Sequence, residues 1–452
     1  MSTSESPDRE SLDALAKHAA LARTQKFFAR EPEAVVEYRS QGRVLIVGPQ
    51  AAAETLANAL QSPLQADILD PGAGHNRLNT APHVWFAHGR GIRLDGHLGA
   101  YHVQVGDDEQ RNDPPLPDAF DLVVDLGEKA LIPSELPPFG YFRAAVDDMT
   151  DPAALAAQLR DMVGEFEKPK YFDYRTDICA HGYAGMQGCT RCLDACPAEA
   201  IISLEDLVRV DPFLCQGGGA CVSACPSGAM RYTLPRAANM LDGLRKLLQS
   251  YRDQGGQDAV ILFHDAEDGA ERLAGLGDEV PGRVIPVPLE ELASVGMEIW
   301  LSALAYGAKR IGLLDTEQVP ARSRAELDRQ LEVVSVLLQG LGYPGTAVMR
   351  VATGPGAWEA WVQAEDMPPI EAGSFWGEGG KRETLFFALD HLAAQVRATV
   401  DAVPLPPQSP FGTLQIDRQA CTLCMACVSV CPPHALADGG TAPRLDLYES
   451  RC

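Results

Sequence analysis

The sequence predicts a mixed α/β and α+β protein. It has two α/β regions of the Rossmann or flavodoxin type, one cysteine-rich module inserted between them and a second one at the C-terminus. Apolar runs bounded by turn residues alternate with helical patterns over residues 41–165 and 257–400. Eleven of the twelve cysteines lie in three blocks of related spacing outside these regions. We therefore expect five parts, at residues 1–165, 166–236, 237–400, 401–412 and 413–452.

The first part begins with an expected amphipathic helix, because Leu12, Leu15, Ala19 and Ala22 recur at helical spacing. Its α/β pattern predicts strands at 43–47, 66–69 and 120–125 and a helix at 51–60. The turn that starts at Gly48 does not fit G-x-G-x-x-G, and Pro49 stands where a backbone should approach a phosphate. A bound flavin or nucleotide is therefore not expected here, and no other segment of the chain predicts one.

The second α/β region, residues 257–400, contains no cysteine, and we expect it to be a scaffold. Its strand and helix patterns alternate as in the first region. It predicts helices at 237–252, 298–306 and 321–341 and strands at 258–264, 283–288, 309–315 and 346–352. The segment 401–412 is rich in proline and predicts a linker to the last module.

The composition excludes several classes of function. A net charge of −24 disfavours nucleic acid, whose binding depends on Lys and Arg, and it disfavours anionic lipid. No apolar run reaches the roughly 18–20 residues that span a bilayer, so no membrane insertion is expected. The N-terminus is polar and acidic, unlike a secretory signal, which predicts a cytoplasmic protein. Clustered cysteines in such a chain indicate metal binding rather than disulfides.

The cysteine blocks carry the chemistry. The run C-x2-C-x2-C-x3-C-P is the signature of bacterial ferredoxins that hold cubane iron–sulfur clusters. The third block fits it in full, and the other two keep the Cys-x3-Cys-Pro ending. The blocks are Cys179-x9-Cys189-x2-Cys192-x3-Cys196-Pro197, Cys215-x5-Cys221-x3-Cys225-Pro226 and Cys421-x2-Cys424-x2-Cys427-x3-Cys431-Pro432. Zinc usually takes two separated cysteine pairs, which these runs do not resemble.

In two-cluster ferredoxins the last cysteine of each block ligates the cluster of the other block. This rule defines two ligand sets, which we call cluster A and cluster B. Cluster A takes Cys179, Cys189, Cys192 and Cys225, and cluster B takes Cys196, Cys215 and Cys221.

Both blocks depart from the signature. Met186 stands where the first block should have its leading cysteine, so Cys179 must reach in across a loop with three glycines. Gly218 stands where the second block should have its middle cysteine. Cluster B therefore has three thiolates, which predicts a [3Fe–4S] cluster or a [4Fe–4S] cluster with an outside ligand. A distant Cys, Asp, His or water as fourth ligand is the alternative.

The third block repeats the pattern of the first two. Cys215 follows Cys196 by 19 residues, and Cys452 follows Cys431 by 21, each after a Cys-Pro helix and two short strand patterns. Cluster C then has Cys421, Cys424 and Cys427, with Cys431 or Cys452 as the fourth ligand. The alternative is that Cys452 is an unpaired terminal thiol.

Two resemblances follow from these residues. The phrases Asp177 to Pro197 and Cys215 to Cys221 resemble a family of proteobacterial multi-cluster ferredoxins that is associated with formate dehydrogenases containing molybdenum or tungsten. The resemblance implies electron transfer with a redox enzyme such as formate dehydrogenase. The phrase Trp300 to Leu314 is similar to the delta-type iron–sulfur subunit of methyl-viologen-reducing hydrogenases, but the cluster cysteines of that subunit are missing here. That second resemblance implies docking, not redox chemistry.

The leading hypothesis is a cytoplasmic electron carrier with about three clusters. It is more consistent with a redox subunit than with a stand-alone enzyme, because no catalytic dyad, phosphate loop or substrate pocket is visible. The alternatives are an assembly or maturation factor for a molybdenum or tungsten oxidoreductase, and a subunit of a flavin- or nucleotide-dependent oxidoreductase.

Overall fold

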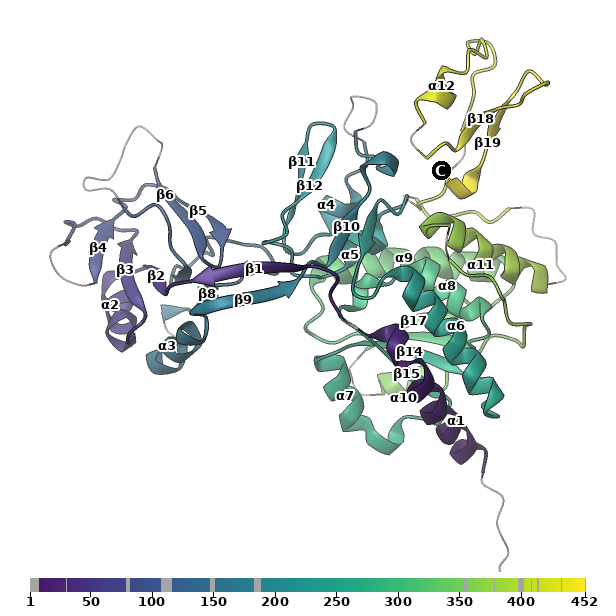
Figure 1. Cartoon of the computed structure of the whole chain (residues 1–452), viewed down its shortest axis with the longest axis horizontal. Helices are drawn as coiled ribbons and strands as arrows, with labels where there is room; N and C mark the ends of the chain where they lie inside the picture. Colours follow the sequence, from purple (N-terminus) through teal and green to yellow (C-terminus); the bar gives the residue numbers. More distant parts are fainter. Residues whose placement is uncertain are drawn as a thin grey trace, which may run out of the picture.

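The structure is a computed structural model with two α/β regions, a two-stranded ribbon and two cysteine-rich modules (Figure 1). The first α/β region lies at one end, a two-stranded ribbon runs from it toward the second α/β region, and the C-terminal module projects from the far side (Figure 1). The described residues are 8–29, 31–78, 82–106, 116–146, 151–182, 188–352, 354, 356–377, 379–396, 402–407, 409–412, 414–431 and 433–451.

The first α/β region is built on a five-stranded parallel sheet with the order β4-β3-β2-β7-β8. Alternate residues of β2 face opposite layers, as expected for a buried parallel strand. Val44 and Ile46 pack against α2 and α3, whereas Leu45 and Val47 pack against the β5–β6 hairpin. The elements are β2 (Arg43–Val47), α2 (Gln50–Ala59), β3 (Gln65–Asp70), β4 (His83–Phe86), β5 (Ile92–His97), β6 (Ala100–Val105), β7 (Leu122–Asp125), β8 (Tyr141–Arg143) and α3 (Pro152–Asp161).

The ribbon consists of β1 (Val35–Ser40) and β9 (Gly164–Pro169), which pair antiparallel although the whole first region lies between them in the chain. It brings the chain entering that region beside the chain leaving it. Local sequence patterns did not predict this pairing, because the two strands are separated by an entire domain.

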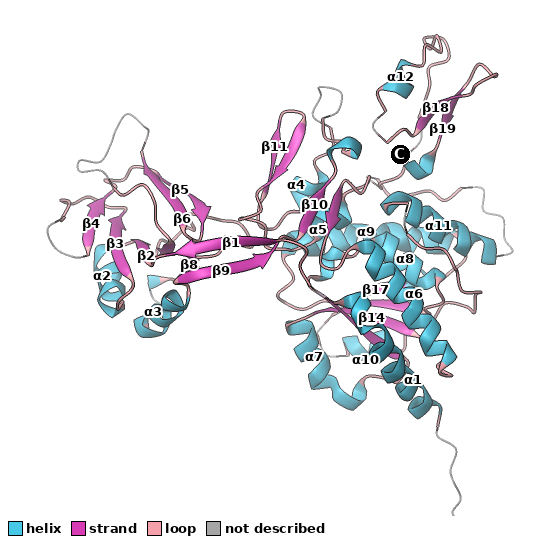
Figure 2. Ribbon diagram, viewed as in Figure 1, coloured by secondary structure: helices cyan, strands magenta, loops and turns pink. Residues whose placement is uncertain are grey.

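The second α/β region has a four-stranded parallel sheet with the order β15-β14-β16-β17, covered by helices on both faces (Figure 2). Ile261 and Phe263 of β14 face the core with α6, α8, α9 and α11, whereas Val260 and Leu262 face α7 and α10. The elements are α6 (Ala237–Asp253), β14 (Val260–Asp265), α7 (Asp268–Leu276), β15 (Val284–Leu289), α8 (Met297–Ala305), β16 (Arg310–Leu314), α9 (Ala321–Gly340), β17 (Val348–Val351), α10 (Ala357–Val362) and α11 (Lys381–Gln395).

The N-terminal helix α1 (Arg9–Thr24) packs against α6 of the second region, although the sequence grouped it with residues 1–165. The predicted buried face was wrong: Leu12 and Leu15 are exposed, and Ala16 and Ala20 are buried instead. Ala16 and Ala20 share a core with Leu244 and Leu248 of α6.

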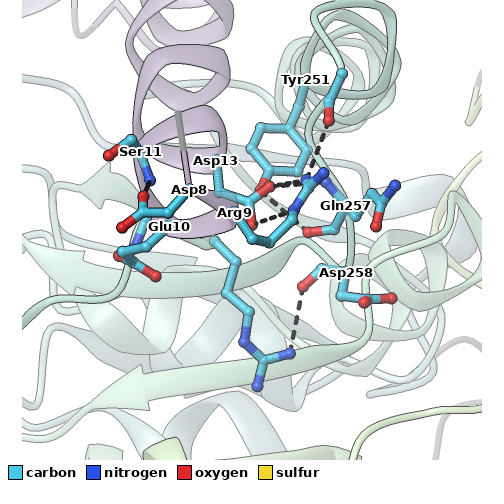
Figure 3. Close-up of polar contacts among 11 residues, drawn as sticks. Asp8, Arg9, Glu10, Ser11, Asp13, Tyr251, Gln257 and Asp258 are labelled. Atoms are coloured by element: carbon cyan, nitrogen blue, oxygen red, sulfur yellow. Dashed lines mark hydrogen bonds and ion pairs between the residues drawn. The ribbon is translucent and has the colours of Figure 1, made fainter. Parts of the chain in front are cut away.

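A buried carboxylate holds α1 in place (Figure 3). Oδ1 of Asp13 accepts hydrogen bonds from the hydroxyl of Tyr251 at 2.8 Å and from the backbone N–H of Gln257 at 2.9 Å. Arg9 pairs with the same carboxylate from one turn away, with Nε 2.9 Å from Oδ2. Burial alone would raise the pKa of Asp13, but the bonds from Arg9, Gln257 and Tyr251 outweigh it and lower the pKa.

The inserted module contains two short antiparallel strand pairs and two short helices. The helices α4 and α5 pack on each other and on α9, and Ala195, Ala220 and Ala224 belong to the core of the second α/β region. The module is therefore joined to that region through a common core rather than through a linker. Its elements are β10 (Phe172–Tyr174), paired with β13 (Met230–Tyr232), β11 (Ile201–Leu204), paired with β12 (Leu207–Val210), α4 (Arg191–Ala195) and α5 (Ala220–Ala224).

The C-terminal module contains α12 (Ala426–Ser429), the antiparallel pair β18 (Leu436–Asp438) and β19 (Leu445–Leu447), and the 3-10 turn η7 (Glu449–Arg451). Arg382 of α11 fastens it, donating to the carbonyl of Glu449 at 3.0 Å and to that of Pro410, in the preceding linker, at 2.6 Å. In the described parts of the chain, no helix combines the length and apolar character that crossing a bilayer requires.

Candidate metal centres

The cysteines predicted for cluster A gather beside α4 and α5. Cys192 lies within α4, Cys225 follows the end of α5, and Cys179 follows the 3-10 turn η3 (Thr176–Ile178). Burial, together with the neighbouring thiols of Cys225, Cys189 and Cys179, raises the pKa of Cys192 to about 12. Burial and the thiols of Cys225 and Cys179 likewise raise the pKa of Cys189.

The cysteines predicted for cluster B form a second group. Burial raises the pKa of Cys221 well above its usual value, and the thiols of Cys215 and Cys196 add to the effect. Cys196 comes from the first block, so this block contributes to the second group as the ferredoxin rule predicts. The structure thus brings both predicted sets together, and the presence of a cluster in each set stays a prediction.

The donor chemistry of both groups fits an iron–sulfur cluster. Several buried thiols near one another resist ionisation, because each thiolate repels the others in a medium of low polarity. Iron ions supply the positive charge that keeps coordinating thiols deprotonated. Among the described residues, no three His, Cys, Asp or Glu side chains converge at the spacing of a single metal ion. A cubane spreads its ligands over different irons, so its thiolates do not meet at one point.

The glycines of the second block shape the wall of cluster B. Gly217 and Gly219 have φ values of +80° and +71°, a conformation that side chains rarely adopt. A Cβ on Gly219 would also lie 2.5 Å from the backbone of Ser294, so this glycine lets the loop approach the second α/β region. The described residues around the resulting cavity include Cys196, Cys215 and Cys221, and no other Cys, Asp, Glu or His.

Backbone amides point at the sulfur atoms that precede proline. The N–H of Met230 donates to Sγ of Cys225 at 3.4 Å, and the N–H of Ala435 donates to Sγ of Cys431 at 3.3 Å. Hydrogen bonds to cluster sulfurs raise the reduction potential, because they stabilise the added negative charge.

The structure also shows the internal repeat in the turns before the leading cysteines. Asp211 and Asp417 each cap their own turn, accepting hydrogen bonds from Phe213 at 2.9 Å and from Gln419 at 2.8 Å. The N–H of Cys215 donates to the carbonyl of Asp211 at 3.1 Å, and that of Cys421 to the carbonyl of Asp417 at 2.8 Å.

Two cations next to cluster B were not predicted as site residues. Lys168 is buried and donates from Nζ to the carbonyls of Phe213 at 2.9 Å and Cys215 at 2.6 Å. Burial lowers its pKa to about 8. Arg322, at the start of α9, donates to the carbonyl of Cys196 at 3.0 Å. Both are distant in sequence from the cysteine blocks that they contact, so no local motif could have revealed them.

The loop that leads to Cys189 is held by a histidine. His181 is almost fully buried, with Nδ1 2.8 Å from the carbonyl oxygen of Cys189 and Nε2 2.8 Å from the hydroxyl of Ser203. Its role is thus hydrogen bonding. The predicted loop from Cys179 to Cys189, which includes Met186, lies partly outside the described residues.

The third group of cysteines differs from the first two in its exposure. Cys421, Cys424 and Cys427 are exposed and Cys431 is half-buried. The backbone N–H of Ala426 and the hydroxyl of Thr422 lower the pKa of Cys424. Cys452 lies outside the described residues, so the fourth ligand of cluster C is still predicted to be Cys431 or Cys452.

A protein side chain occupies the edge of the first sheet at the turn that starts at Gly48. Oδ2 of Asp70 accepts a hydrogen bond from the backbone N–H of Gln50 at 2.8 Å. The carboxylate thus caps the start of α2, the place that a phosphate takes in dinucleotide-binding proteins.

Comparisons with known proteins agree with the cysteine pattern. Residues 208–231 and 413–436 match two families, each described as a 4Fe-4S binding domain. A segment of 80 residues is 40% identical to the selenate reductase subunit beta of Thauera selenatis, covering 17% of this chain and 22% of that protein. The chain therefore spans about a fifth of the length of this relative. The protein is a mixed α/β iron–sulfur protein with ferredoxin-type 4Fe-4S domains, the kind of domain used in electron transport.

Proposed function

We propose that this chain is an electron-transfer subunit or partner of an oxidoreductase and carries about three clusters in the sets A, B and C. The observation that carries the proposal is the gathering of the predicted ligands of A and B into two adjacent groups. The thiols of Cys192 and Cys225, from set A, influence the ionisation of Cys221 in set B. Cys192 and Cys221 lie on α4 and α5, which pack on each other. Two clusters held by these neighbouring helices suit the passage of single electrons.

The second α/β region supports this function as a scaffold. It shares its core with the inserted module through α4 and α5, and it fastens the C-terminal module through Arg382. Such a scaffold keeps the clusters at constant separation. The first region has the parallel strand order β4-β3-β2-β7-β8, and we assign it to the Rossmann type in a structural role.

Cluster B is proposed to be a [3Fe–4S] cluster or a [4Fe–4S] cluster with an outside ligand. The support is its wall, in which three cysteines and three glycines surround the cavity. A three-iron cluster gives a paramagnetic signal in the oxidised state, so electron paramagnetic resonance of the oxidised protein distinguishes the two forms.

The proposed partner is a redox enzyme that exchanges electrons through an iron–sulfur relay. The relative of this chain is named as the beta subunit of a selenate reductase, which supports a redox enzyme as partner. The sequence resemblance to ferredoxins associated with formate dehydrogenase makes that enzyme the first to test. Formate with catalytic formate dehydrogenase should reduce this protein much faster than formate alone. Failure of several such dehydrogenases to reduce a cluster-loaded protein would contradict the partner, whereas absence of clusters would contradict the function itself.

A further inference from the structure

A cavity of about 670 Å³ lies where both cysteine-rich modules meet the second α/β region. We call it the junction cavity. Its walls come from the segment around β13, the starts of α6 and α11, the segment 294–299 and the C-terminal module. The volume is within the range of about 300–1,000 Å³ that is typical of sites for small molecules and cofactors. Neither the cluster ligands nor the proposed electron path accounts for it.

The junction cavity lies between predicted ligands of two clusters. Ile178, which lines it, directly precedes Cys179, and Ser227 comes two residues after Cys225, both of set A. Pro433, on the opposite module, comes two residues after Cys431 of set C. A ligand bound here would thus be placed beside centres that exchange single electrons.

The charge of the cavity is opposite to that of the chain. In a protein of net charge −24, the cationic lining residues outnumber the two carboxylates, Glu298 and Glu383. The cations are Arg175, Arg231, Arg236, Lys381, Arg382 and Arg451. Arg175, Arg231 and Arg236 also pair with Asp177, Asp173 and Glu33, whereas the guanidinium of Arg451 lies 5.1 Å from the ring centre of Tyr448.

The first turn of α6 adds backbone donors to this charge. The helix has 17 residues, its N-cap is Arg236, and no side chain caps it among the described residues. Arg236, Ala237 and Ala238 all line the cavity. Backbone N–H groups at an uncapped helix start, next to arginines, bind phosphate.

A buried carboxylate is the second polar feature of the cavity wall. Glu298 is only 4% exposed, and its Oε2 has no hydrogen bond within the described structure. Nζ of Lys381 lies 3.7 Å away and donates instead to the carbonyls of Val222 at 2.8 Å and Ser223 at 2.6 Å. A buried carboxylate oxygen without a hydrogen bond is costly, and an N–H of a ligand that reached it would remove that cost.

Apolar side chains form the remaining wall, among them Ile178, Met230, Leu241, Val295 and Ile299. A ligand that matches these features carries a phosphate, an apolar ring system and an N–H donor. Flavins have these groups, and they also exchange electrons with one-electron centres.

We propose that the junction cavity binds a flavin nucleotide. The sequence did not predict this site, because its walls come from segments scattered over the chain. One local signal existed, the run Gly377-Glu-Gly-Gly-Lys381 before α11, which has the glycines of a ligand-contacting loop.

The test uses the full chain, anaerobically reconstituted with iron and sulfide, and titrates it with flavin mononucleotide while following flavin fluorescence. Ala238→Trp adds bulk to the cavity wall, and Asn239→Trp places the same bulk on the next exposed residue, which does not line the cavity. Arg451→Gln removes a lining charge, and Arg418→Gln removes an exposed charge elsewhere in the same module. Unchanged cluster spectra in all four variants show that they fold.

We expect one flavin mononucleotide per chain, binding weakened by at least about tenfold in Ala238→Trp and Arg451→Gln, and unchanged binding in the two controls. ADP, which has phosphates but no flavin ring, should bind more weakly. No saturable binding, equal binding to Ala238→Trp and the unmodified protein, or ADP binding as tight as that of flavin would each overturn the proposal. The cluster signals test the proposed electron-transfer function separately from flavin binding. Absence of clusters would contradict that function, whereas absence of flavin binding would contradict only the proposed site.

Discussion

Arg322 donates a hydrogen bond from Nη1 to the carbonyl oxygen of Cys196 at 3.0 Å, the cysteine that crosses from the first block to the second group. Nη2 of the same guanidinium donates to Oε1 of Glu199 at 2.7 Å, and its Nε lies 3.6 Å from Oε1 of Glu135 in the first region. One side chain of α9 thus joins the second α/β region to the inserted module and to the first region at the edge of cluster B. Burial raises the pKa of the Cys196 thiol, and the charge of Arg322 offsets part of that rise.

Replacing Arg322 with Gln should make cluster B harder to reduce. A nearby cation stabilises the more negative reduced cluster, and its loss should lower the midpoint potential on the order of tens of millivolts. A redox titration followed by electron paramagnetic resonance measures the shift. Arg39→Gln, which removes an exposed ion-paired arginine on β1, is the control. An unchanged cluster B, or an equal shift in cluster A, would contradict the assignment of Arg322 to cluster B.

The crossover predicts opposite losses from two cysteine variants. Cys196→Ala should abolish the signal of cluster B and retain that of cluster A, whereas Cys225→Ala should do the reverse. Iron content and the paramagnetic spectra of the reduced and oxidised variants measure this. Cys427→Ala, which should affect only cluster C, controls for general cluster loss. If Cys196→Ala eliminated cluster A and preserved cluster B, each block would be holding its own cluster.

Asp13→Ala should destabilise the attachment of α1 to α6. The change leaves the buried hydroxyl of Tyr251 and the N–H of Gln257 without their acceptor, at a cost of about 1–3 kcal/mol. Thermal unfolding at pH 7 measures the loss, and Leu15→Ala, at a 65% exposed position, should stay within about 0.5 kcal/mol of the unmodified protein.

The pH dependence of this variant follows from the lowered pKa of Asp13. Its contribution is present above the unfolded-state pKa of about 4 and is lost as the pH falls through the folded-state value. The difference between Asp13→Ala and the unmodified protein should therefore be constant from pH 8 to pH 6. A difference that grows toward acid would show that the carboxylate is not stabilising in its charged form.

Glu291 should have the opposite dependence. Burial, together with Asp265, Glu290 and Glu267, raises its pKa to about 7. The protonated form is favoured by folding, so its contribution is fully present below the unfolded-state pKa and is lost as the pH rises through about 7.

Glu291→Gln removes this charge and should stabilise the protein at pH 8.5, on the order of 2 kcal/mol, with a smaller gain at pH 6. Melting temperatures at the two pH values test this expectation. Glu271→Gln, at an exposed position of α7, should show no such trend. A gain that is equal at both pH values would mean that Glu291 does not titrate between them.

The elements with a local signal could be predicted closely. The apolar runs at 43–47 and 309–315 became β2 and β16, and the long pattern at 321–341 became α9. In each, the residues that determine the element are neighbours in the chain. The metal-ligating cysteines were visible for the same reason, because cluster ligands recur at short spacing within a tight loop.

Features that depend on distant partners were not predictable. The ribbon of β1 and β9, the packing of α1 on α6 and the contact of Arg322 with Cys196 each join segments that are far apart in sequence. The buried face of α1 shows the same limit, since the chain has larger apolar residues at Leu12 and Leu15 but buries Ala16 and Ala20. Shape complementarity with α6, which the periodicity does not encode, decides between the two faces.

The most direct test of the central claim is anaerobic purification with iron, sulfide and zinc counts, combined with paramagnetic resonance in both redox states. The account predicts a brown protein with bound sulfide, iron for about three clusters, and a reduced [4Fe–4S] signal from cluster A that interacts magnetically with cluster B, because sets A and B are adjacent. A colourless protein, or one that holds zinc without sulfide, would contradict it.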